Sequence, residues 1–270
     1  MKSLFTHLSE SLLGIDDENI GSAAEEFRIG EWLDGAYEID GGYEIDSNTR
    51  TISANGDVEV KDKSIDRLMP EGWSWGRVDG RFSCVYCKNL KSLEGAPKEL
   101  CGANGTFICS FCTNLKTLKG APIKISGVFD CFGCDGLRNL EGITQDAGRG
   151  ILCSSCKNLE RLKGAPRICY DGFICNSCSG LKSLEGAPEE VEGDLYCTDC
   201  TNLKSLEGAP KKVSGDFDCS GCKKLISLSK GPKWVGGVYD CTDCKSLRTL
   251  IGAPKDKYVV TTGCKNLNNT

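Results

Sequence analysis

Nineteen cysteines carry most of the potential chemistry of this chain, and sixteen of them form C-x-x-C pairs. The pairs begin at residues 84, 109, 131, 153, 175, 197, 219 and 241. Two such pairs brought together would supply the four thiolates of a tetrahedral zinc site, and neighbouring thiols can also respond to oxidants. A cysteine-based metal-binding or redox protein is therefore one interpretation of the chain.

The cysteine pairs belong to a longer repeat. Six of the seven intervals between first cysteines are 22 residues, and seven of the eight prolines follow a first cysteine by thirteen positions. Leucines recur at plus six and plus nine, as Leu90 and Leu93, Leu115 and Leu118, Leu137 and Leu140, Leu159 and Leu162, Leu181 and Leu184, Leu203 and Leu206, Leu225 and Leu228, and Leu247 and Leu250. A fixed period of this length predicts a solenoid.

One repeat, residues 213–228, shows how the cysteines would be placed. Side chains alternate along a strand, so Phe217 and Cys219 should point inward together. Cys222 and the two leucines then turn inward, and the Gly-Ala-Pro of most repeats ends the coil. Coils stack about 4.8 Å apart, so equivalent cysteines form continuous rows of buried thiols instead of four-ligand clusters. We therefore expect no dedicated metal site and no cofactor.

The repeat resembles the leucine-rich repeat, whose core string is L-x-x-L-x-L-x-x-(N/C)-x-L. Residues 217–225, FDCSGCKKL, fit this string with Cys222 in the ladder position. The S-L-x-G-A-P return is similar to short repeats of secreted bacterial ubiquitin ligases, but nothing matches their cysteine-bearing ligase domain. Residues 57–267 look closer to uncharacterised repeat proteins of tailed phages and their hosts. The resemblance implies a leucine-rich repeat solenoid and a phage or mobile-element origin, without an assigned activity.

Other chemistry has little support in the sequence. The single histidine, His7, lies in the terminal segment, so the array cannot assemble a Cys-His or Ser-His nucleophile, and we expect no enzyme. The glycines follow the repeat and form no phosphate loop. Residues 1–78 carry 7 Lys and Arg against 17 Asp and Glu, which leaves 26 against 21 for residues 79–270. That small positive excess predicts no nucleic-acid binding.

Three regions follow from the pattern. We predict an N-terminal helical segment over residues 1–35, with one helix over 1–13 and another over 23–33 capped by Ser22. Residues 36–78 should form an antiparallel β-meander and a degenerate first coil, with Trp73, Trp75 and Val78 closing it. Residues 79–270 form the array of 22-residue units, and about nine coils are expected. The fold class is thus a repeat solenoid of short parallel strands with irregular return segments and a small α+β cap.

The outward strand positions form the face on which repeat proteins usually bind. Its first part is apolar or aromatic and its far part is acidic, and stacked like charges repel unless a cation or a basic partner neutralises them. The predicted partner-binding residues are Tyr86, Ile108, Phe111, Phe132, Leu152, Ile174, Tyr196, Asp194, Asp199, Asp216, Asp218, Asp240 and Asp243.

We therefore predict a non-catalytic scaffold that binds a host or virion protein through this face. An alternative is a structural virion component that assembles through residues 1–13 or by self-association of an open C-terminal edge. No signal peptide and no run of apolar residues long enough to span a membrane is evident, so we expect no membrane partner. The many thiols favour a reducing location, which is the cytoplasm, or the host cytoplasm or virion if the chain is phage-encoded.

Overall fold

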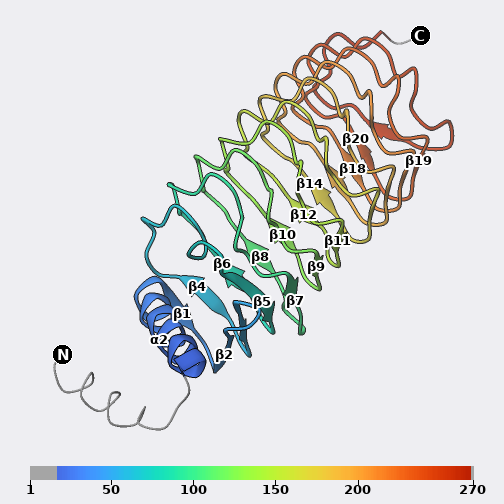
Figure 1. Cartoon of the computed structure of the whole chain (residues 1–270). Helices are drawn as coiled ribbons and strands as arrows, with labels where there is room; N and C mark the ends of the chain where they lie inside the picture. Colours follow the sequence, from blue (N-terminus) through green and yellow to red (C-terminus); the bar gives the residue numbers. More distant parts are fainter. Residues whose placement is uncertain (1–16, 269–270) are drawn as a thin grey trace.

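The computed structural model describes residues 17–268, which form an elongated solenoid of stacked coils behind a small N-terminal cap (Figure 1). The longest sheet runs along the whole stack, and every neighbouring pair from β4 onward is parallel. In spatial order its strands are β1 (Tyr37–Ile39), β4 (Val58–Val60), β6 (Phe82–Ser83), β8 (Phe107–Ile108), β10 (Phe129–Asp130), β12 (Ile151–Leu152), β14 (Phe173–Ile174), β16 (Leu195–Tyr196), β18 (Phe217–Asp218), β20 (Tyr239–Asp240) and β21 (Val259–Val260). The predicted repeat solenoid is confirmed.

A second side of the solenoid is also built from strands. One sheet contains β2 (Tyr43–Asp46), β3 (Thr51–Ala54), β5 (Ser74–Val78), β7 (Glu99–Leu100), β9 (Lys124–Ile125) and β11 (Asp146–Ala147). The other contains β13 (Ile168–Cys169), β15 (Glu190–Val191), β17 (Lys212–Val213) and β19 (Trp234–Val235). The return segments are therefore irregular only in part. Their two-residue strands form because an exposed residue alternates with a buried one, as in Lys212 and Val213.

The cap differs in detail from its prediction. Helix α2 spans Asp17–Ala36, longer than the expected 23–33, because no proline interrupts the segment. Strands β1 and β4 pair antiparallel, and β2 and β3 pair antiparallel in the other sheet, so the two pairs are nested and do not form a meander. Strand β4 does begin the solenoid, as predicted. The helix predicted over 1–13 lies outside the described residues.

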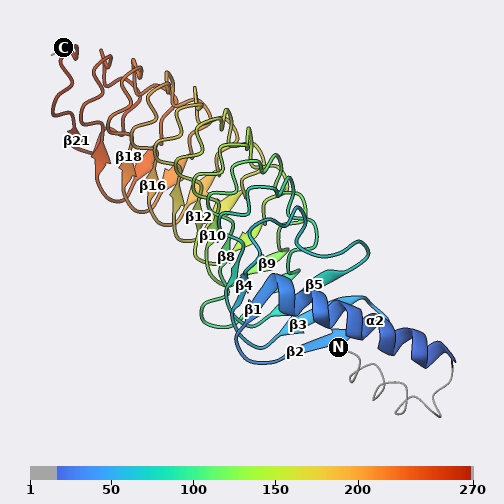
Figure 2. The same cartoon turned by 90° about the vertical axis from the view of Figure 1, so that its left-hand side faces the viewer.

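Helix α2 lies across the N-terminal end of the stack, beside β1 to β3 (Figure 2). Beneath it, Tyr37 packs edge-on against Trp75, with ring centroids 5.2 Å apart, and both rings contact Phe82. The hydroxyl of Tyr37 donates a hydrogen bond to the carbonyl of Leu68. Trp75 and Val78 are fully buried in β5, in agreement with their predicted role of closing the first coil.

The core of each regular coil contains the same five inward side chains. These are the aromatic or aliphatic strand residue, both cysteines and both leucines, and they are fully buried in the coils from Phe82 to Leu228. Equivalent rings stack on each other, as in the 5.6 Å contact between Phe82 and Phe107. Burying one such Leu or Phe side chain stabilises the fold by about 1.5–3 kcal/mol. The repeat therefore supplies most of the core.

Ten parallel strands, β4 to β21, define about ten coils, one more than predicted. The short last unit forms a coil of the stack, because β21 pairs in register with β20. There Thr261 replaces the first cysteine, while Cys264 keeps the second position. Its strand keeps the buried position, at Val259, so the coil forms without the full repeat.

One departure from the repeat explains another. Tyr239 occupies the core position that is Phe in five earlier coils, and its buried hydroxyl has no hydrogen-bond partner within residues 17–268. A methyl group added to Gly231 would lie 2.7 Å from that hydroxyl oxygen. Gly231 stands where most repeats have the alanine of Gly-Ala-Pro. The missing methyl group makes room for the tyrosine hydroxyl.

This compensation can be tested with a double-mutant cycle. Gly231→Ala should lower the free energy of unfolding by about 1–3 kcal/mol through overpacking. Tyr239→Phe should change it little, because the variant loses an unsatisfied buried hydroxyl, and the double variant should recover most of the loss. Urea denaturation measures all three. Gly35→Ala, with open space around the new methyl group, is the control. Additive effects of the two substitutions would contradict the explanation.

Candidate functional site

The exposed side of the long sheet carries a continuous line of side chains, the second residue of each strand. We call Ile108, Asp130, Leu152, Ile174, Tyr196, Asp218 and Asp240 the outer row; all are partly exposed and stacked in register. The inward neighbours on both sides of each one are buried. The predicted alternation is therefore confirmed, and the predicted partner-binding residues in this row do lie together on one face.

A second line runs along the turn inside each C-x-x-C pair. We call Tyr86, Phe111, Gly133, Ser155, Ser177, Asp199, Gly221 and Asp243 the turn row. Each has a left-handed backbone, with φ between 53° and 69°. This conformation lets the N–H of Phe111 donate to the carbonyl of Phe132 at 2.7 Å, and the same bond recurs along the row. The turn thereby extends the ladder between coils beyond the two-residue strands.

Two aromatic residues in the turn row are conformationally unusual. Left-handed backbone costs a residue with a Cβ about 1–2 kcal/mol, and for bulky side chains it is a genuine outlier. Gly133 and Gly221 show that glycine fits the position, yet Tyr86 and Phe111 occupy it. Their rings stack with centroids 4.8 Å apart and planes 7° from parallel, and Tyr86 is 51% exposed. Backbone strain of this kind is concentrated at functional sites.

A shallow depression lies beside these rings. Its volume is about 530 Å³, and its apolar lining is Phe111, Phe132, Leu152 and Ile174, four of the predicted partner-binding residues. Phe132 packs edge-on against Phe111, with centroids 5.2 Å apart. The polar lining was not among the predicted site residues and consists of Ser110, Asp130, Ser154, Ser155, Asn176 and Ser177. The polar residues could have been recognised from their places in the same rows.

The acidic part of the face has a different local structure. One carboxylate oxygen of Asp194 accepts the backbone N–H of Asp216 at 2.8 Å, and Asp216 accepts that of Val238 at 2.7 Å. Asp218 and Asp240 each accept the N–H two residues further on, at 2.8 and 2.7 Å. Backbone N–H groups therefore stabilise these four carboxylates.

The remaining acidic residues complete this picture. Asp199 and Asp243 are exposed. Tyr196 donates its hydroxyl to the second carboxylate oxygen of Asp194 at 2.9 Å, and this bond, with burial, raises the pKa of Tyr196 to about 12. The predicted residues thus divide into an apolar group beside a depression and an acidic group that bonds mostly to its own backbone.

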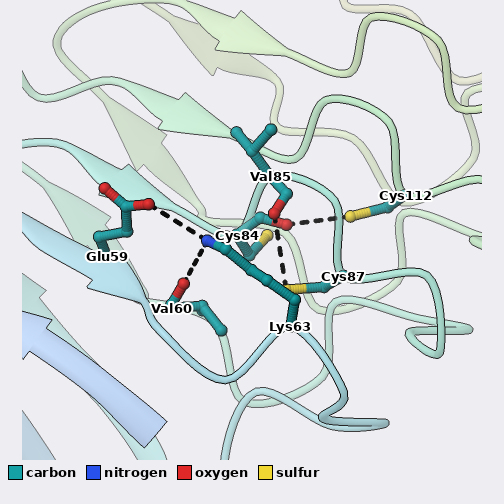
Figure 3. A network of polar contacts seen from close by, with 7 residues as sticks. All are labelled: Glu59, Val60, Lys63, Cys84, Val85, Cys87 and Cys112. Atoms are coloured by element: carbon teal, nitrogen blue, oxygen red, sulfur yellow. Dashed lines mark hydrogen bonds and ion pairs between the residues drawn. The ribbon is translucent and has the colours of Figure 1, made fainter.

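The cysteine rows hold neighbouring coils together. From Cys112 onward, the second cysteine of each coil donates its thiol to the carbonyl of the first cysteine in the preceding coil, as Cys112 does to Cys84 at 3.1 Å (Figure 3). The same bond recurs at 3.0–3.2 Å for Cys134, Cys156, Cys178, Cys200, Cys222, Cys244 and Cys264. Cys222 therefore acts in the ladder position, where a small buried donor is required.

The thiols are free and mostly inaccessible. All nineteen cysteines are unpaired, and seventeen of them are buried. Burial raises the pKa of Cys153 well above its ordinary value and the pKa of Cys87 and Cys169 to about 12. Protonated, buried thiols such as these three are poor nucleophiles and poor ligands. Hydrogen bonds to neighbouring cysteines instead lower the pKa of Cys112, Cys156 and Cys244. In the part of the chain that the structure describes, no group of three or more His, Cys, Asp or Glu residues could hold a metal ion.

No family model, no curated protein and no solved structure matches the chain. Within residues 17–268, no helix combines the length and the apolar character needed to cross a bilayer. The fold and face define the chain as a repeat solenoid of stacked parallel strands with an apolar depression on its long sheet.

The backbone role of the acidic residues predicts unequal effects on stability. Asp216→Ala should destabilise the protein by about 1–2 kcal/mol, because the N–H of Val238 loses its acceptor. Asp199→Asn, which removes the same charge from an exposed position and keeps a residue that tolerates left-handed backbone, should stay within about 0.5 kcal/mol. Chemical denaturation of both variants, with Asp216→Asn to retain an acceptor, measures the difference. Equal losses for Asp216→Ala and Asp199→Asn would show that charge, not hydrogen bonding, matters.

Because its thiols are buried, the protein should lose stability at alkaline pH. Cys169 keeps its proton in the folded state up to about pH 12, whereas in the unfolded chain it ionises near its ordinary value of 9.0. Its contribution is therefore complete below about pH 8.5 and declines as the pH rises toward 12, by up to about 1.4 kcal/mol per pH unit. Urea denaturation from pH 7 to 10.5 under reducing conditions measures the slope.

Cys169→Val provides the matched control for that slope, because valine fills the equivalent position at Val191 and Val213. Both proteins should fold at pH 7. Above pH 8.5 the free energy of unfolding of the variant should fall less steeply with pH, because the contribution of the Cys169 thiol is absent. Identical slopes would mean that Cys169 ionises in the folded state.

Proposed function

We propose that the chain is a non-catalytic scaffold that binds a protein partner through the exposed side of its long sheet. The observation that carries the proposal is the pair of stacked aromatic residues at left-handed positions, Tyr86 and Phe111, beside an apolar depression. Exposing aromatic rings to water is unfavourable, and a left-handed backbone at a bulky residue is strained. Both costs are accounted for if a partner covers the rings.

The composition of the depression suits a polypeptide. Four apolar side chains surround hydroxyl, amide and carboxylate groups, so the surface offers an apolar anchor position and hydrogen bonds next to it. Its volume exceeds that of any single side chain, and its lining comes from four successive coils, those of β8, β10, β12 and β14. An extended segment that follows the stack could place successive side chains on successive coils.

The sequence resemblance supports the same function. The ladder-position cysteines and the S-L-x-G-A-P returns resemble leucine-rich repeats, and that kinship belongs to the proposal, as does a phage or mobile-element origin. Solenoids of this kind typically bind proteins on their strand face. The proposed partner is accordingly a host or virion protein, in the cytoplasm or in the particle.

A displayed library of random 12-residue peptides tests the proposal without a known partner. The immobilised protein should enrich peptides that bind the depression, and Phe132→Ala should weaken these peptides by about tenfold or more, as expected for an aromatic hot spot. Ile123→Ala is the control, since Ile123 is 72% exposed and precedes β9 in a different sheet. Thermal denaturation verifies that both variants fold. Failure to enrich any peptide whose binding depends on Phe132 would refute the proposed face.

A further inference from the structure

Asp130 is a carboxylate in unusual surroundings. Its neighbours in the outer row are aliphatic on both sides, since β10 pairs in register with Ile108 of β8 and Leu152 of β12. Phe111 and Phe132 line the same depression. The side chain is only partly exposed, and burial is the main cause that raises its pKa above the ordinary value. An ionised carboxylate at this position is poorly solvated.

The internal partners of Asp130 are neutral. One carboxylate oxygen accepts the backbone N–H of Phe132 at 2.8 Å, and the hydroxyl of Ser110 contributes a further hydrogen bond. Twelve ion pairs occur within residues 17–268, and none of them includes Asp130. Its charge is therefore not compensated by a basic side chain of the described part of the chain.

Two other aspartates in the outer row differ from Asp130 in their surroundings. Asp218 and Asp240 occupy the same place in the outer row and make the same bond to an N–H two residues further on. They lie beside each other in the acidic part of the face, outside the depression. The backbone bond thus recurs in three coils, but only at Asp130 does the carboxylate lie between apolar groups that could bury a partner.

We infer that Asp130 binds a lysine or arginine side chain of the partner polypeptide, and that the residues flanking this basic residue are apolar. This inference rests on the proposed function. The cation would pair with the carboxylate, while the aliphatic stem packs on Leu152 and the faces of Phe111 and Phe132 contribute cation–π attraction. Closing the depression over the pair would strengthen the attraction, because water is excluded. The basic contact of the partner is thereby assigned to the apolar half of the face, and not to the acidic half.

The peptides enriched on the wild-type protein provide the test. Those that depend on Phe132 should contain a lysine or arginine flanked by apolar residues. Replacing that residue in a synthetic peptide by norleucine should weaken binding to the wild-type protein about tenfold or more, and added salt should weaken the unmodified peptide more than the norleucine form. Fluorescence anisotropy with labelled peptides measures each affinity.

Asp130→Asn should weaken binding of the basic peptide to a similar extent and change binding of the norleucine peptide little. The substitution in the protein and the norleucine in the peptide each remove the same ion pair. The asparagine can still accept the Phe132 N–H. Asp46→Asn is the matched control, because Asp46 also accepts the N–H two residues further on but lies in β2, in a different sheet, and should leave binding unchanged. Asp218→Asn, which changes the same charge in the same slot of the outer row, should weaken binding less than Asp130→Asn.

The outcomes separate the two proposals. If Phe132-dependent peptides lack basic residues, or if norleucine and Asp130→Asn leave their affinity unchanged, the role of Asp130 is wrong and the binding face stands. If Asp218→Asn weakens the peptides as much as Asp130→Asn, the attraction is a property of the whole face and the assignment to Asp130 is again wrong. If no Phe132-dependent peptide is enriched, both proposals fall.

Discussion

Hydrogen bonding between the backbones of successive coils is the constraint on which the rest of this structure depends. In each coil the strand and the following turn donate to carbonyls of the next coil, as Phe217, Cys219 and Gly221 donate to Val238, Asp240 and Thr242. This ladder fixes the coils at the spacing of neighbouring strands, about 4.8 Å. Equivalent residues of successive coils must then stack directly on each other. Every position in the repeat becomes a row, and each row needs side chains that tolerate copies of themselves.

The rows meet this requirement in different ways. Flat rings and leucines stack without cost in the core, and the second cysteines donate to the carbonyls of the preceding coil. On the second side of the solenoid charges alternate in sign, because Glu99 lies between Arg77 and Lys124 in register. The turns carry ion pairs between coils, such as Lys119 with Glu94 at 2.7 Å. Each exposed pair contributes little, but alternation makes a slip by one coil unfavourable.

The periodicity of the sequence is sufficient to predict the solenoid and its inward residues, because burial repeats with the same period as the residue types. It does not predict the nested cap strands, since residues 36–60 contain four short alternating runs whose pairing depends on contacts with α2 and the first coil. The left-handed turn row is also hidden, because eight positions with one backbone conformation hold five residue types. Glycine at 133 and 221 was the available signal. Asp130 was visible as an outward residue, but its burial among apolar groups depends on three neighbouring coils.

A repeat whose interior is this constrained can vary only where a row permits it, so departures from the repeat are informative. The smaller residue at Gly231 accommodates a larger one at Tyr239, and packing alone explains that pair. Packing does not explain Tyr86 and Phe111, because glycine would satisfy the same turn with less strain. Nor does it explain Asp130, which interrupts an aliphatic stretch of the outer row between Ile108 and Leu152. Phe111 and Asp130 line one depression in the neighbouring coils of β8 to β14, and Tyr86 stacks on Phe111. Departures without a common cause would have no reason to lie together, and the proposed binding of a partner at this place on the face accounts for their position.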